Sequence, residues 1–326
     1  MRPLLPRLPS WDVARAARLA VLALSVVESL AAETVTPAPI PTPAPAPAPA
    51  ALPRGYHIGN SLTYGVVTFP DFSAYMGDPG QPYVCGYHVL WGATLSTIVQ
   101  KQDAPSTMVK AFGPYPVALA SGHWDIVTLQ PSFAVMEGPQ GDLAQAAALV
   151  SQATAHAPNV QIYIYETWPT VGDKAPPGTY ARMWERTYAP GAWDHVLYSH
   201  DYCSRLVDAL RAEHLTARPI LLLPVGAVLS HLDAKAHAGL VPGVATVESL
   251  YRDGTHLGTI GNFVAMCTWR CVLRRQNPQA LNGSLLPHEI SPALARIVEQ
   301  TVWETVAKMP LTGITAPRDA AGADHH

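Results

Sequence analysis

Gly59-Asn60-Ser61-Leu62-Thr63 follows the short apolar run Tyr56-His57-Ile58. A strand that ends in Gly-polar-Ser places a serine hydroxyl on a tight turn between the strand and a helix. Because α/β folds display nucleophiles at such turns, Ser61 is a candidate nucleophile. Serine is common in turns of any function, so this assignment depends on finding a base and a group that orients the base.

Both groups occur together almost two hundred residues later, in Asp253-Gly254-Thr255-His256-Leu257. A serine hydroxyl needs a base to remove its proton, and a histidine base needs a carboxylate that holds its tautomer. Among thirteen histidines, His256 is therefore the candidate base, and Asp253 is the candidate orienting group.

Short apolar runs, each closed by a turn residue, alternate with longer segments of helical periodicity. The runs are Tyr56–Ile58, Tyr83–Leu90, Asp125–Leu129, Gln161–Tyr165 and Ile220–Pro224. The helical segments are Leu95–Lys101, Asp142–Ala155, Tyr202–His214 and Ile260–Arg274. This alternation predicts an α/β fold in which helices cover both faces of a parallel sheet. Ligands bind such sheets at the carboxyl ends of the strands, where Ser61, Gly92, Gln130 and Glu166 each follow a run.

The two polar stretches together resemble the first and last sequence blocks of the SGNH (GDSL-like) hydrolases, which read Gly-Asp/Asn-Ser-Leu and Asp-x-x-His. The resemblance extends roughly from Gly55 to Arg275. It implies a three-layer α/β/α sandwich with a flavodoxin-like central parallel sheet, and ester hydrolysis by Ser61, Asp253 and His256. It also implies an oxyanion hole formed by the N–H groups of Ser61 and Gly92, although Gly92 by itself, without the other blocks, is more typical of an ordinary strand-to-helix turn.

The third block of that family, Gly-x-Asn-Asp, has no match. The chain reads Leu129-Gln130-Pro131-Ser132-Phe133 at this place, so the asparagine amide that the family offers to the oxyanion is missing. Loss of one such donor typically costs about two to three orders of magnitude in rate, so we expect a replacement. Gln130 is the preferred third donor of the oxyanion hole because it carries the same primary amide, and the Ser132 hydroxyl is the alternative.

Three further residues are candidates for substrate binding: Asn60, Glu166 and Trp168. Trp168 can stack on a sugar ring or an aromatic acyl group, or it can close the edge of the core. Glu166 can instead form a surface salt bridge. The aromatic-rich segment from Gly172 to Asp201 is longer than an ordinary connection, which predicts either a rim over the site or an insertion that covers the sheet edge.

The N-terminal region is typical of an exported protein. Residues 1–32 combine several arginines, the apolar run Leu19–Val27 and small residues before a cleavage point after Ala31 or Ala32, as in secretory signal peptides; an amphipathic helix is the alternative. Residues 33–53 are rich in proline and alanine and predict an extended spacer. We therefore expect a folded domain over 54–314, a polar tail over 315–326, and a secreted or periplasmic location without stable membrane insertion after signal removal.

Net charge and the spacing of cysteines and histidines bear on the partners, cofactors and disulfides that the protein is expected to have. The net charge of −3 gives no reason to expect nucleic acid as a partner. Neither Cys-x-x-Cys nor His-Glu-x-x-His occurs, so no metal or other cofactor is expected. Cys267 and Cys271 share one helical face and are predicted to be buried thiols, whereas Cys85 and Cys203 can pair with each other or with these two.

The sequence thus predicts a secreted serine esterase, and export with an aromatic site favours acetyl esters of carbohydrates. A lipase or arylesterase of the same fold is the first alternative. A non-catalytic glycan-binding module is the second, although such a module has no need for the serine, aspartate and histidine together.

Overall fold

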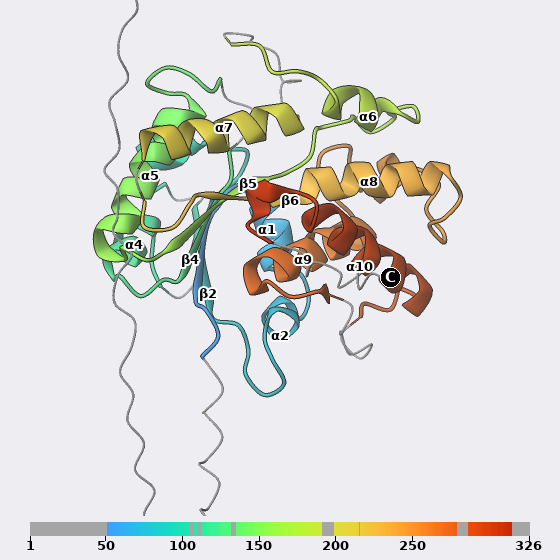
Figure 1. Cartoon of the computed structure of the whole chain (residues 1–326), viewed down its shortest axis with the longest axis horizontal. Helices are drawn as coiled ribbons and strands as arrows, with labels where there is room; N and C mark the ends of the chain where they lie inside the picture. Colours follow the sequence, from blue (N-terminus) through green and yellow to red (C-terminus); the bar gives the residue numbers. More distant parts are fainter. Residues whose placement is uncertain are drawn as a thin grey trace, which may run out of the picture. The chain divides into compact units, whose positions relative to one another are not determined.

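A single mixed sheet forms the centre of the protein (Figure 1). Within the described residues its six strands lie in the order β3-β2-β1-β4-β5-β6. The strands are β1 (Gly55–Gly59), β2 (Cys85–Leu90), β3 (Thr107–Val109), β4 (Ile126–Leu129), β5 (Gln161–Glu166) and β6 (Leu221–Pro224). All neighbours pair in parallel except β2 and β3. Without the short edge strand β3, this is the strand order of flavodoxin-like sheets, whose direction of winding changes between β1 and β4.

The computed structural model describes residues 51–104, 107–109, 112–131, 135–190, 199–214, 216–278 and 286–314. The expected leader (1–32), most of the linker (33–53), Ser132 and the polar tail (315–326) lie outside these ranges. Among the described helices, none is both long enough and apolar enough to cross a membrane.

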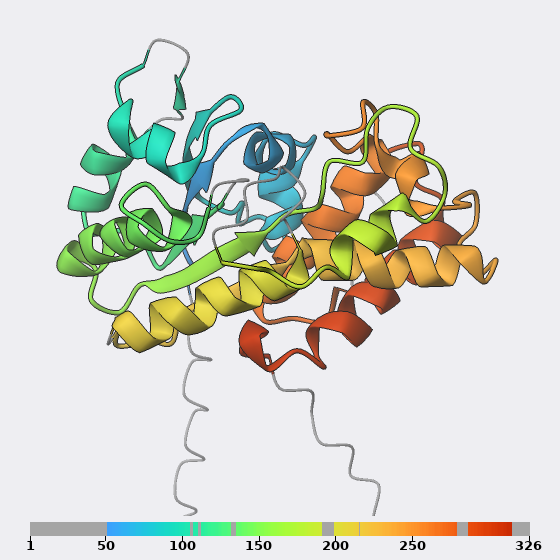
Figure 2. The same ribbon diagram turned by 90° about the horizontal axis from the view of Figure 1, so that it is seen from above.

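Helices cover both faces of the sheet, as the first two views show (Figures 1 and 2). One hydrophobic cluster includes α1, α2, α6, α8, α9 and α10, and a second includes α3, α4, α5 and α7. Along β5, Tyr163 and Tyr165 belong to the first cluster, whereas Ile162 and Ile164 belong to the second, as the alternation of side chains along a strand requires. The helices are α1 (Ser61–Val67), α2 (Phe72–Met76), α3 (Leu95–Gln100), α4 (Tyr115–Ala120), α5 (Asp142–His156), α6 (Thr179–Trp184), α7 (His200–Glu213), α8 (Val225–His237), α9 (Thr259–Arg274) and α10 (Pro292–Val306).

The predicted three-layer α/β/α fold is confirmed, and each predicted strand and helix is present within two residues of its expected ends. Helices α8 and α10, which fill the first cluster beside α9, were not predicted from the sequence, and neither were the short helices α2, α4 and α6. The three residues of β3, which pair antiparallel with β2 at the edge of the sheet, were not predicted as a strand.

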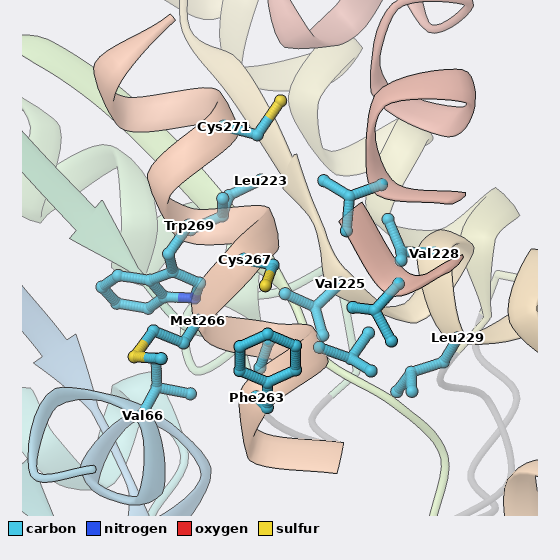
Figure 3. Packing of buried hydrophobic residues seen from close by; sticks show 14 of the residues in the cluster. Val66, Leu223, Val225, Val228, Leu229, Phe263, Met266, Cys267, Trp269 and Cys271 are labelled. Atoms are coloured by element: carbon cyan, nitrogen blue, oxygen red, sulfur yellow. The ribbon is translucent and has the colours of Figure 1, made fainter. Parts of the chain in front are cut away.

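Figure 3 shows the first cluster, where α9 packs against β6, α1 and α8. All four cysteines of the chain are buried, and the structure forms no disulfide among them. Cys267 and Cys271 face this cluster as predicted, and burial raises the pKa of Cys271 to about 12. Cys85 belongs to the first cluster and Cys203 to the second, so the sheet separates them and they do not form the bridge that the sequence left open.

Glu299 on α10 is a carboxyl group with only 6% of its surface exposed. Burial raises its pKa from 4.5 to about 7. Below pH 4.5 the carboxyl group is protonated in both the folded and the unfolded protein, and its burial then costs no ionisation energy. The folded protein loses stability as the pH rises from 4.5 through 7, because the unfolded chain ionises this group more readily.

Glu299→Gln should accordingly gain stability relative to the parent protein as the pH is raised. Between pH 5 and pH 8 the relative gain should be about 2 to 3 kcal/mol, because only the parent must ionise a buried carboxyl group. Urea unfolding at the two pH values measures this difference, and an equal effect of the substitution at both values would contradict the assigned burial cost.

Candidate active site

Ser61 lies where β1 ends and α1 begins. Asn60 is the N-cap of α1, and its side-chain oxygen accepts a hydrogen bond from the Leu62 N–H at 3.0 Å. Its Nδ2 donates to the Ala93 carbonyl at 3.1 Å. Asn60 is 3% exposed, so the side chain proposed to bind substrate instead fixes the turn that presents Ser61.

Gln130 lies behind this turn. Its Oε1 accepts hydrogen bonds from the Asn60 N–H (3.1 Å), the Thr63 N–H (3.1 Å) and the Thr63 hydroxyl (2.6 Å). Its Nε2 donates to Asn60 Oδ1 at 2.8 Å. A Cβ at Gly59 would collide with both Thr63 and Gln130. Gln130 is 1% exposed, so the prediction that it donates to an oxyanion does not fit its position, and the amide instead ties β4 to the nucleophile turn.

The loop Asp253–His256 is held from behind by the segment that follows β5. The indole N–H of Trp168 donates to the Thr255 carbonyl at 2.8 Å, and the Gly172 N–H donates to the Gly254 carbonyl at 3.2 Å. Gly254 has φ +68°, and a Cβ there would collide with the backbone of Gly172. Glycine is required at this position for two reasons: its backbone is left-handed, and another segment of the same chain approaches it closely.

Ser61, His256 and Asp253 form a continuous chain of hydrogen bonds. The Ser61 hydroxyl lies 2.9 Å from His256 Nε2, and His256 Nδ1 lies 3.0 Å from each carboxylate oxygen of Asp253. The carboxylate also accepts the backbone N–H groups of His256 and Thr255. Burial acts to raise the pKa of Asp253, but these hydrogen bonds outweigh it and lower the pKa to about 2. The charged carboxylate accepts a hydrogen bond from Nδ1–H, which leaves Nε2 without a proton and able to accept the serine proton.

Two backbone donors that were predicted from the sequence to form part of the oxyanion hole are unused within the described residues. Within the described residues, no hydrogen bond uses the N–H of Ser61 or that of Gly92. Gly92 has φ +62°, and nothing lies within 4 Å of the place where a Cβ would be. Its left-handed conformation therefore accounts for the glycine, and the space beside it is open.

A cavity of about 240 Å³ adjoins Ser61 and His256. Its walls include the half-exposed ring of Trp91, the ring of Tyr64 and the side chain of Arg252. None of the three was predicted from the sequence as a site residue. Trp91 and Arg252 directly precede Gly92 and Asp253, and this adjacency was the available signal.

Two of the predicted substrate-binding residues have other positions. Glu166 is fully buried, and its carboxylate accepts the Ala227 N–H at 2.9 Å and pairs with His200 Nδ1 at 2.9 Å. It is therefore neither a pocket residue nor a surface salt bridge, but a buried acceptor at the start of α8. Trp168 reaches the cavity wall but is 1% exposed, so it closes the edge of the core and anchors the histidine loop, and its ring has no free face for stacking.

The described part of the aromatic segment also lies away from the cavity. Tyr180 and Trp184 are buried, their ring centroids are 5.9 Å apart, and the Tyr180 hydroxyl donates to the Gly226 carbonyl. These rings pack against α8, so this part of the segment does not form a rim over Ser61. In the described residues no group of three or more His, Cys, Asp and Glu side chains is placed to hold a metal ion.

No family model matches the sequence, and no curated protein matches it. The fold does have similar solved structures, among them the following two. A DUF4886 family protein from Bacteroides uniformis aligns with a TM-score of 0.53 at 16% identity, over 81% of this chain and 99% of that one. A protein named provisionally as a platelet activating factor, from Streptococcus, aligns with a TM-score of 0.40 at 15% identity, over 69% of this chain and 86% of that one. The first of these likenesses supports the fold and nothing beyond it.

Proposed function

We propose that the chain is a serine-dependent ester hydrolase of the SGNH type. The observation that carries this proposal is the hydrogen-bonded series Ser61–His256–Asp253, of which Ser61 and His256 line a cavity. In this mechanism His256 removes the Ser61 proton while the oxygen attacks the ester carbonyl, and then returns that proton to the leaving alcohol. Water, activated by the same histidine, releases the acid from the acyl-enzyme.

The developing oxyanion is stabilised by the N–H groups of Ser61 and Gly92. Both are unused within the described structure, and two backbone donors can form an oxyanion hole without a side-chain amide. This replaces the assignment of Gln130, whose amide is engaged behind the turn.

The proposed substrate is a short-chain ester, in particular an acetyl ester of a carbohydrate. The cavity of about 240 Å³ is small compared with typical small-molecule sites, which favours an ester with a short acyl group. Exposed Trp91 offers a face to a sugar ring. On the composition of residues 1–32, we also propose that the protein acts after export.

An ester series tests this proposal against the lipase alternative. With p-nitrophenyl esters, kcat/KM should fall by at least about tenfold from acetyl to octanoyl, because a longer acyl chain leaves less of this small cavity to the rest of the ester. Acetylated monosaccharides should release acetate, and triglycerides should not be hydrolysed. A preference for octanoyl esters would favour a lipase, and no turnover of any ester would favour a binding module.

A further inference from the structure

Among the described residues, Arg252 contributes the only Lys or Arg side chain to the walls of the cavity beside Ser61, and none of its wall residues is Asp or Glu. The Arg252 side chain is 63% exposed, and its Nε donates to Asp253 Oδ2 at 3.3 Å. Within the described residues, no hydrogen bond or ion pair involves its two terminal NH₂ groups. Asp253 also accepts hydrogen bonds from His256 and contacts only Nε of Arg252, so the two NH₂ groups of the guanidinium are available to a ligand.

An aromatic surface adjoins the same cavity. Trp91 is 48% exposed, and its ring lies 4.9 Å from that of Tyr64 at a tilt of 59°. Tyr64 is supported in turn by Tyr87, edge to face at 5.9 Å. A large apolar ring exposed beside a nucleophile, and held in place by neighbouring rings, is suited to stack on a ring of the substrate.

We propose that Arg252 and Trp91 together select esters whose alcohol is a ring that carries a carboxylate, such as an O-acetylated uronic acid. The ring lies against Trp91, and the carboxylate accepts two hydrogen bonds from the fork of the guanidinium. Within the described residues no Asp or Glu lines this cavity, and Asp253, which faces Nε of the same guanidinium, is the one carboxylate that the bound group would approach. The inference rests on the proposed ester hydrolysis and names the substrate class of the same site.

The test uses two acetyl esters that differ in one group. These are O-acetylated methyl galacturonoside and O-acetylated methyl galactoside, which share the ring and the ester and differ only in carboxylate against hydroxymethyl. The readout is the ratio of their kcat/KM values, because any effect of Arg252 on Asp253 changes both values equally and cancels.

In the full-length protein this ratio should be at least about tenfold in favour of the acidic ester at low salt, and should fall when NaCl is raised to about 0.5 M. Arg252→Gln should bring the ratio close to one, mainly through KM for the acidic ester, and Arg252→Lys should give an intermediate ratio because it keeps the charge and loses the fork. Trp91→Ala is the matched control. It should weaken both esters by a similar factor and leave the ratio in place.

A ratio near one in the parent protein, or a ratio that Arg252→Gln leaves unchanged, would overturn the proposal. Turnover of p-nitrophenyl acetate with neither sugar ester hydrolysed would also overturn it while ester hydrolysis stands. No turnover of any of the three esters would remove the proposed hydrolase and the specificity together.

Discussion

Replacing Ser61 with alanine is expected to lower kcat by about four to six orders of magnitude, with no loss of stability. The hydroxyl is half-buried and bonded only to His256 within the described structure, so its removal leaves no buried group without a partner. His256→Ala should have a similar effect on kcat, because an unassisted hydroxyl is a poor nucleophile.

The double variant of Ser61 and His256 provides the control. Residues that act as one unit are strongly non-additive, so the double variant should be no slower than the slower single variant. If the rate loss of the double variant equals the product of the two single losses, Ser61 and His256 act in separate steps. That result would contradict the hydrogen-bonded series as the reacting unit.

The second large effect is expected at Gln130, and it should appear in stability as well as in rate. Gln130→Leu leaves three buried donors of Asn60 and Thr63 without an acceptor, at a cost of about 1 to 3 kcal/mol each. We expect a loss of at least about 3 kcal/mol in the free energy of unfolding. The rate should fall by at least about tenfold with it, because the turn that positions Ser61 is no longer fixed.

Thr63→Val is the matched control, since it removes only the hydroxyl from this network and should cost about 1 to 2 kcal/mol. Combined with Gln130→Leu it should add less than this, because its partner has already gone. A Gln130→Leu protein of unchanged stability and much reduced kcat would restore Gln130 as an oxyanion donor and refute the positioning role.

The order and type of the main elements could be predicted because they depend on local patterns. Short apolar runs closed by turn residues predicted the parallel strands, and their carboxyl ends located Ser61 at the edge where the structure has it. Ser61, Asp253 and His256 were chosen from two stretches far apart in sequence, and the structure brings these side chains within hydrogen-bonding distance.

The roles of individual polar and aromatic residues at that edge could not be predicted, because they depend on which way a side chain turns. Gln130 follows β4 and Glu166 is the last residue of β5, yet both turn inward and satisfy backbone N–H groups. Trp168 is buried by the histidine loop, whereas Trp91 stays exposed beside the nucleophile. Only tertiary packing distinguishes these two tryptophans.

The central claim, that Ser61 is a nucleophile activated by His256, is tested most directly by covalent labelling with a serine-directed fluorophosphonate. The folded parent protein should take up one label, and peptide mapping should place it on Ser61. Ser61→Ala should take up none, and His256→Ala should react far more slowly because its serine keeps its proton. Labelling of Ser61→Ala at another residue, or undiminished labelling of His256→Ala, would contradict the account.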